Sequence, residues 1–109
     1  MTITANLLKT DGPAGSAGTV LATQAVAAPA NWTRLTDLDN FTPVGGAKLV
    51  ISSDAEAFRF AVMDPVSSKD AASADRVPRT NGVLVPWFGT GAEDEETVPY
   101  GAQIWVKAA

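Results

Sequence analysis

The sequence predicts an all-β protein, a small antiparallel β-sandwich or barrel with an extended N-terminal arm. Short apolar runs rich in Val, Ile and Phe recur along the chain, glycine and proline mark turns between them, and no strongly amphipathic helical pattern is found. The chain has 109 residues, which is enough for one ordinary domain. We therefore expect a flexible N-terminal arm over residues 1–18 and a single β domain over residues 19–109.

The arm is predicted from KTDGPAGSAG, residues 9–18, which is rich in glycine and contains a proline. Such a stretch buries too little apolar surface to order itself. Ile3, Leu7 and Leu8 precede it as apolar residues with little local support. They belong either to a frayed terminus or to an arm that becomes ordered on a neighbouring subunit, and the second alternative makes them candidate interface residues.

Three segments of the first two thirds of the chain favour strands. TVLATQAVAA, residues 19–28, contains β-branched residues among helix-favouring alanines and ends before Pro29. KLVIS, residues 48–52, is a short apolar run, and AFRFAVM, residues 57–63, alternates apolar and polar positions in the period of a half-buried strand. The short polar connection between the last two segments predicts that they form a hairpin.

The next segments are irregular. Residues 64–82 form a long polar excursion, which is uncommon unless it is functional or disordered, and a short helical turn fits within SKDAASAD. VLVPWF, residues 83–88, reads as a strand, and Pro86 within it indicates an edge strand or a bulge. The acidic run at residues 93–96 predicts a solvated, glycine-flanked loop that discourages edge pairing.

The chain closes with YGAQIWVKAA, in which Ile104 and Val106 share one face of a predicted strand. If these two face the core, Trp105 and Lys107 face outward, and they are covered either by the chain's own 64–82 loop or by another subunit. Arg76 and Arg79 in that loop carry guanidinium groups suited to carboxylates across an interface. These four residues complete the set of candidate interface residues.

Composition excludes several classes of function. The chain contains no histidine and no cysteine, so the commonest general base, thiolate nucleophiles and Cys-ligated zinc are absent. We predict no catalytic residues, no metal site, no cofactor and no enzymatic activity. A net charge of −4 without a basic stripe argues against nucleic-acid binding. No apolar run approaches the length of a membrane-spanning helix, and the N-terminus lacks the pattern of a secretory signal.

The segment from Trp32 to the C-terminus resembles small virion proteins of tailed bacteriophages. The resemblance consists of the Trp-Thr opening, FRFAVMDP, the proline-bearing loop, GVLVP, the acidic glycine-rich turn and the closing GAQIWVKAA. It implies a β-sandwich that decorates or cements the capsid surface, made in the host cytoplasm. The implied partners are the major capsid protein or other virion subunits, with a homo-oligomer on the shell. An extended N-terminal arm fits this role.

Two alternatives stay open. A neck, tail or receptor-binding accessory module would bind carbohydrate or another ligand through exposed aromatic residues, for which Trp105 and Tyr100 are candidates. An enzyme that uses carboxylates alone would need two acids converging in a cleft, and nothing in the sequence distinguishes such a pair.

Overall fold

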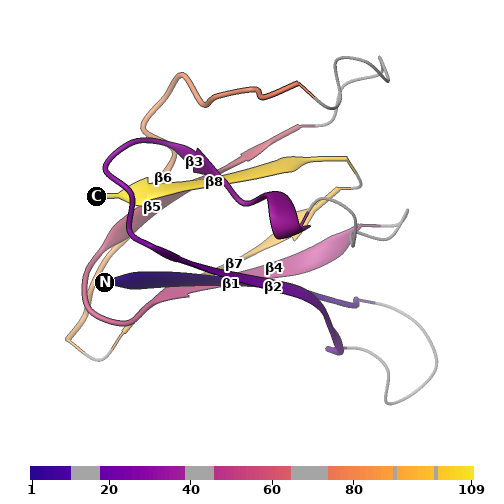
Figure 1. Ribbon diagram of the computed structural model, residues 1–109. Helices are drawn as coiled ribbons and strands as arrows, with labels where there is room; N and C mark the ends of the chain where they lie inside the picture. Colours follow the sequence, from indigo (N-terminus) through magenta and orange to yellow (C-terminus); the bar gives the residue numbers. More distant parts are fainter. Residues whose placement is uncertain (11–17, 39–45, 65–73, 90, 100) are drawn as a thin grey trace.

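Two antiparallel four-stranded sheets pack face to face in the computed structural model of the chain (Figure 1). The structure describes residues 1–10, 18–38, 46–64, 74–89, 91–99 and 101–109. The predicted all-β sandwich is therefore confirmed. The described residues contain a single turn of 3-10 helix beside the strands, and none of their helices is long and apolar enough to cross a membrane. The possible helical turn within SKDAASAD, residues 68–75, lies outside the described residues up to residue 73, and Ala74 and Asp75 are not helical.

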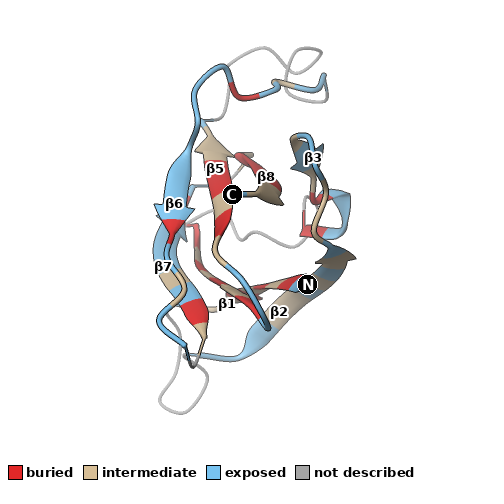
Figure 2. Ribbon diagram, turned by 90° about the vertical axis from the view of Figure 1, so that its left-hand side faces the viewer, coloured by how far each residue is buried: buried red, intermediate tan, exposed pale blue. Residues whose placement is uncertain are grey.

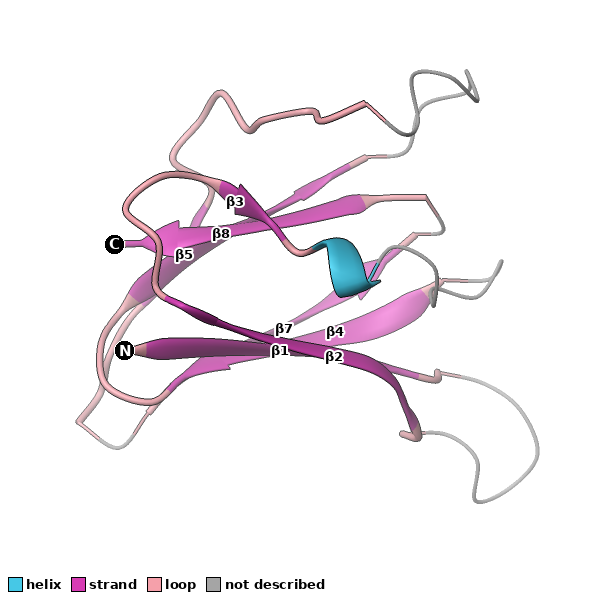
Figure 3. Cartoon of the chain, in the orientation of Figure 1, coloured by secondary structure: helices cyan, strands magenta, loops and turns pink. Residues whose placement is uncertain are grey.

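The strands, coloured in Figure 3, divide between the sheets in an order that does not follow the sequence. Sheet A has the order β2-β1-β4-β7 and sheet B the order β3-β8-β5-β6. In chain order the elements are β1 (Thr2–Leu8), β2 (Val20–Ala27), β3 (Thr33–Arg34), η1 (Thr36–Leu38), β4 (Ala47–Ser53), β5 (Phe58–Met63), β6 (Val83–Val85), β7 (Ala92–Val98) and β8 (Gln103–Ala108).

The first residues are not an arm, which corrects the sequence prediction. They form β1, which pairs antiparallel with β2 on one side and β4 on the other. Ile3, Ala5 and Leu7 alternate with polar residues and are completely buried, so their apolar side chains have a core to enter. The period-two pattern of TITANLL already carried this signal, but the glycine-rich stretch after it suggested flexibility. Residues 11–17 of the predicted arm lie outside the described residues.

The predicted strands over residues 48–52 and 57–63 are confirmed as β4 and β5, but the predicted hairpin between them is wrong. β4 pairs with β1 and β7, whereas β5 pairs with β8 and β6. The connection carries the chain from one sheet to the other. It is held by the backbone N–H of Thr2, which donates to Asp54 Oδ1 at 2.8 Å, and by the hydroxyl of Ser53, which donates to the Glu56 carbonyl. The two strands therefore face each other across the core.

The acidic run is a strand rather than a loop. Residues 93–96 lie within β7, at the edge of sheet A, where they pair with β4. Pairing with β4 supplies the backbone hydrogen bonds that overcome the low strand propensity of acidic residues. The expectation that these carboxylates discourage edge pairing fits this position, because charged side chains on an edge strand oppose the approach of another strand.

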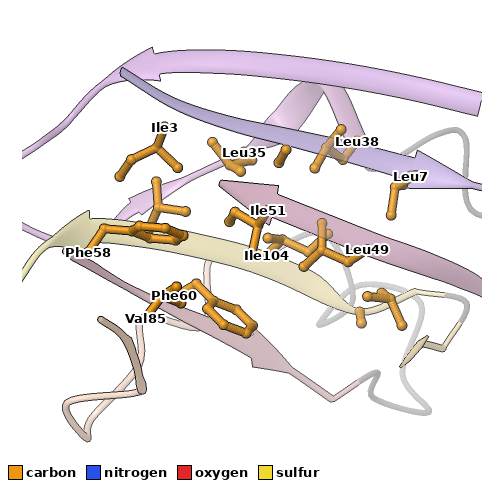
Figure 4. Packing of buried hydrophobic residues seen from close by; sticks show 14 of the residues in the cluster. Ile3, Leu7, Leu35, Leu38, Leu49, Ile51, Phe58, Phe60, Val85 and Ile104 are labelled. Atoms are coloured by element: carbon orange, nitrogen blue, oxygen red, sulfur yellow. The ribbon is translucent and has the colours of Figure 1, made fainter. Parts of the chain in front are cut away.

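The core lies between the inner faces of the two sheets, as Figure 4 shows. Alternate residues of β1 and β4 meet Phe58 and Phe60 of β5 and the apolar pair of β8, Ile104 and Val106. The short helix η1 lies at the side of the sandwich between β2 and β3 (Figures 1 and 2). Leu35 and Leu38, at η1, belong to the core (Figure 4). Ile104 and Val106 are 3% and 0% exposed, so the predicted core face of the closing strand is confirmed.

Candidate functional site

Residues 74–82, which we call the strap, cross the outer face of sheet B and form the uppermost trace of Figure 1. Gln103 of β8 holds the start of the strap to the sheet. Its Nε2 donates to the Ala74 carbonyl at 2.6 Å, and its Oε1 accepts from the Arg76 backbone N–H at 2.9 Å. The Gln103 side chain is completely buried. A single amide therefore satisfies two backbone groups of a segment far away in sequence.

Trp105 lies on the same outer face and is only 3% exposed. It sits opposite Ala61 of β5 and Arg34 of β3, and its Nε1 donates to Gln103 Oε1 at 3.3 Å. The sequence analysis left open whether its own chain or another subunit covers this residue. Because the side chain is buried within a single chain, it offers no surface to a neighbour.

Lys107 is next along the face, and its ammonium lies 4.8 Å from the centroid of the Trp32 ring. A cation over an indole face is attracted by the ring's negative π surface. Arg59 of the neighbouring strand β5 is paired with Lys107, and its guanidinium donates to the Asn81 carbonyl at 3.4 Å. Trp32 and the end of the strap therefore cover this part of the face, and the predicted exposed patch of Trp105 and Lys107 is not formed.

Two arginines fasten the strap by their side chains. Arg34 Nη1 forms an ion pair with Asp75 Oδ1 at 2.9 Å, and only 13% of the Arg34 side chain is exposed. Arg76 Nη2 donates to the Asp64 carbonyl at 2.9 Å, which joins the strap to the end of β5. Charge-assisted hydrogen bonds of this kind are stronger than neutral ones, so both contacts favour a fixed position of the strap.

A cleft of about 760 Å³ opens between the strap and the end of β5. Its volume is within the usual range of ligand-binding sites. The lining is mostly apolar and comes from Met63, Asp75, Arg76, Val77, Pro78, Arg79 and Thr80. Pro78 is buried and anchors the strap, whereas Val77 is 52% exposed and Arg79 is exposed. The cleft thus combines an apolar surface with guanidinium groups that bind carboxylates, and it brings together the predicted Arg76 and Arg79.

The other candidate interface residues lie elsewhere. Ile3 and Leu7 are completely buried in the core, and Leu8, at the end of β1, is half-buried. Their burial follows from the pairing of β1 with two strands of its own chain. The side chains of Ile3 and Leu7 therefore have no surface with which to contact a neighbouring subunit.

The acidic strand β7 has an electrostatic feature of its own. Glu96 lies opposite Leu49, on the side of β7 that faces the core. Burial raises the pKa of its carboxyl above the ordinary value, and the negative charges of Asp94 and Asp64 raise this pKa further. On the other face Lys48 forms an ion pair with Glu95 at 2.7 Å. Among the described residues, no three acidic side chains gather in a way that could hold a metal ion.

Neither Gln103 nor Asp75 is distinguished as an important residue by the sequence alone, whereas Trp32 stands out as one of three tryptophans. A glutamine in an otherwise apolar closing strand was the available signal for Gln103, since a buried amide requires hydrogen-bond partners. Asp75 had no comparable signal, because its ion pair with Arg34 joins segments that are distant in sequence.

Comparison with protein families, with curated proteins and with solved structures found no match for this chain.

Proposed function

We propose that the protein is a structural virion protein, a capsid decoration or cement protein that binds and stabilises a phage head through protein–protein contacts. The observation that carries this proposal is the cleft under the strap, where exposed Val77 lies between Arg76 and Arg79. The resemblance of the segment from Trp32 onward to small virion proteins supports the choice of partner, the major capsid protein or another virion subunit.

The chemistry of the cleft suits a segment of another protein. Its apolar lining can bury an aliphatic side chain of the partner, which favours association because apolar surface leaves water. The guanidinium of Arg79 is exposed at the same place and can bind a carboxylate through two parallel hydrogen bonds. An acidic segment with one apolar side chain is therefore the ligand that fits the cleft.

A non-enzymatic role is part of the proposal. A chain without histidine or cysteine lacks the commonest general base and the thiolate nucleophile. The carboxylate that lines the cleft, Asp75, is already paired with Arg34. Copies that contact one another on a shell can also bind through weak single contacts, because each further contact then forms at a high effective concentration.

The proposal is tested with purified heads of the phage that carries this chain. We expect the protein to sediment with expanded heads and cryo-electron microscopy to show it on the shell. Val77→Asp should weaken binding at least about tenfold, because it places a carboxylate beside a surface expected to receive one. Leu84→Asp is the matched control, since Leu84 is 46% exposed but does not line the cleft. Absence of the protein from heads would refute the proposal.

One observation favours a second candidate function, an accessory module of the neck, tail or receptor-binding apparatus that binds carbohydrate. Phe88 is 79% exposed in the segment after β6 and follows Trp87, which is half-buried against the core. An exposed aromatic ring can stack on the apolar face of a sugar. Of the two aromatic candidates from the sequence, Trp105 is buried, and Tyr100 lies outside the described residues. Glycan binding that is lost in Phe88→Ala would support this alternative.

A further inference from the structure

Strand β2 differs from the other sheet edges of this protein. β7 carries four acidic residues in a row, β3 has two residues, and β6 has three residues and is followed by Pro86. Charges, short length and proline are the features by which proteins prevent edge strands from pairing with other chains. β2 has eight residues, VLATQAVA, without charge, proline or glycine. It is the edge at which an added strand meets the least opposition.

The hydrogen bonds of β1 show which backbone groups of β2 point outward. The Ala28 N–H donates to the Met1 carbonyl at 3.0 Å, so this pair belongs to the hydrogen-bonded class of an antiparallel ladder. Hydrogen-bonded and non-hydrogen-bonded pairs alternate along an antiparallel ladder. The next residue of β1, Thr2, should therefore point its carbonyl away from β2, and this carbonyl does accept from the Asp54 N–H on the β4 side. In β2 the residues bonded to β1 are therefore Ala22, Gln24 and Val26, and those with outward N–H and C=O groups are Thr23, Ala25 and Ala27.

These three residues are exposed, and their side chains are small. No hydrogen bond of their outward backbone groups is found among the described residues. Helix η1 contacts β2 at another position, through the Asp37 N–H, which donates to the side chain of Gln24 at 2.9 Å. Figure 1 shows β2 as the nearest strand of sheet A, with η1 above it between the two sheets. The open edge of β2 is therefore accessible to another strand.

We propose that β2 pairs antiparallel with β2 of a second copy of this chain, around a two-fold axis at Ala25. In this register Ala25 lies opposite Ala25 of the second copy, and Thr23 lies opposite Ala27 of the second copy. Each outward N–H then meets an outward C=O, because all three residues belong to the hydrogen-bonded class of the new ladder. The two A sheets join into one continuous sheet.

A second copy fits this edge better than the alternative strand of the same protein, β7. Pairing of β2 with β7 would be head-to-tail and would build a ring or an open filament of subunits, whereas pairing of β2 with itself closes after two copies. The β7 edge would also bring four carboxylates beside an uncharged strand that has no cation to pair with them. β2 carries no charged residue, so two copies of β2 can lie side by side without charge repulsion.

This inference goes beyond the proposed function and does not depend on it, since it concerns only free protein in solution. Amide hydrogen exchange provides the first test, together with sedimentation of the full chain over a range of concentrations. We expect a monomer–dimer equilibrium. When nine tenths of the chains are paired, exchange at Thr23, Ala25 and Ala27 should slow by about tenfold, because only unpaired chains expose these amides. The amides of Gln24 and Val26 should stay protected at every concentration.

Charge substitutions test the register. Ala25→Lys should abolish the dimer, because the two-fold axis places the two new ammonium groups directly opposite each other. Ala55→Lys is the control, since Ala55 is exposed in the connection after β4 and should leave the dimer intact. Circular dichroism establishes that each variant folds. Thr23→Lys combined with Ala27→Glu should strengthen the dimer, because each new cation lies opposite the new anion of the second copy.

Three results would overturn the proposal. The first is a monomer at all concentrations with constant exchange at the three amides. The second is a dimer that Ala25→Lys leaves unchanged, which would place the interface elsewhere. The third is a dimer in which protection appears at a different edge strand.

Discussion

Trp105 donates its indole N–H to Oε1 of Gln103, two residues earlier on the same face of β8, at 3.3 Å. The same oxygen accepts the backbone N–H of Arg76 at 2.9 Å. Gln103 is therefore the point at which the closing strand, the buried indole and the strap meet. Because Gln103 and Trp105 are both buried, the contacts of one amide help decide whether the outer face of sheet B is covered.

Replacement of Gln103 should open the strap. Gln103→Ala leaves the Ala74 carbonyl, the Arg76 N–H and the Trp105 N–H without this partner, and we expect a loss of about 2–4 kcal/mol in the free energy of unfolding. Urea unfolding followed by tryptophan fluorescence measures it. Gln24→Ala is the matched control, because Gln24 accepts one hydrogen bond, from the Asp37 N–H. Its cost should stay near about 1 kcal/mol. Equal costs for the two variants would contradict the role of Gln103.

Trp105 should behave as a buried residue rather than as a contact for another subunit. Trp105→Ala removes a side chain that is 3% exposed, and we expect it to cost about 3–5 kcal/mol of stability. Thermal unfolding measures the change. Trp105→Phe keeps most of the packing and loses the N–H, so it should cost clearly less. An unchanged melting temperature in Trp105→Ala would show that the ring is not covered by its own chain.

Gly82, where the strap meets β6, has a backbone that only glycine adopts readily. Its φ is +64°, and a Cβ there would overlap the Phe60 carbonyl oxygen and lie 2.7 Å from Cη2 of Trp32. Gly82→Ala should therefore cost more than the roughly 1 kcal/mol expected from backbone strain alone. Gly89→Ala is the control, because Gly89 has φ +87° with nothing within 4 Å of the added Cβ. Chemical denaturation compares the two, and similar costs would contradict the close approach of Trp32.

Glu96 should make the protein less stable as the pH rises. Burial, then Asp94 and Asp64, raise the pKa of its carboxyl in the folded chain above its ordinary value of 4.5. Between these two pKa values the folded chain holds more protons than the unfolded chain, so the free energy of unfolding falls as the pH rises through that window. Glu96→Gln should raise the melting temperature at pH 7, and its benefit should vanish at pH values below 4.5.

The control for this effect is Glu93→Gln, which changes the net charge equally on the other face of the same strand, opposite Ser52. Thermal unfolding at a series of pH values measures both variants. If Glu93→Gln stabilises the protein as much as Glu96→Gln does, the effect comes from the net charge and not from the position of Glu96.

Much of the fold was predictable because alternation of apolar and polar residues reports which face of a strand is buried. Local patterns predict the strand over residues 57–63 and the core face of Ile104 and Val106. They also predict the edge position of β6, which Pro86 follows. The candidate site was predictable only in part. Arg76 and Arg79 were identified from their chemistry, but the cleft beside them depends on how the strap lies against β5.

The sequence by itself determined the all-β class and the inward side of its clearest strands, because strand geometry repeats every two residues and is a local property. Only the tertiary structure decided which strands pair, that residues 2–8 form an inner strand and that residues 93–96 form an edge. It also decided that Trp105 is buried on a face whose alternation predicts exposure. The physical reason is that these outcomes depend on contacts between segments distant in sequence, such as those of the Gln103 amide with the strap. A local pattern of residues does not contain that information.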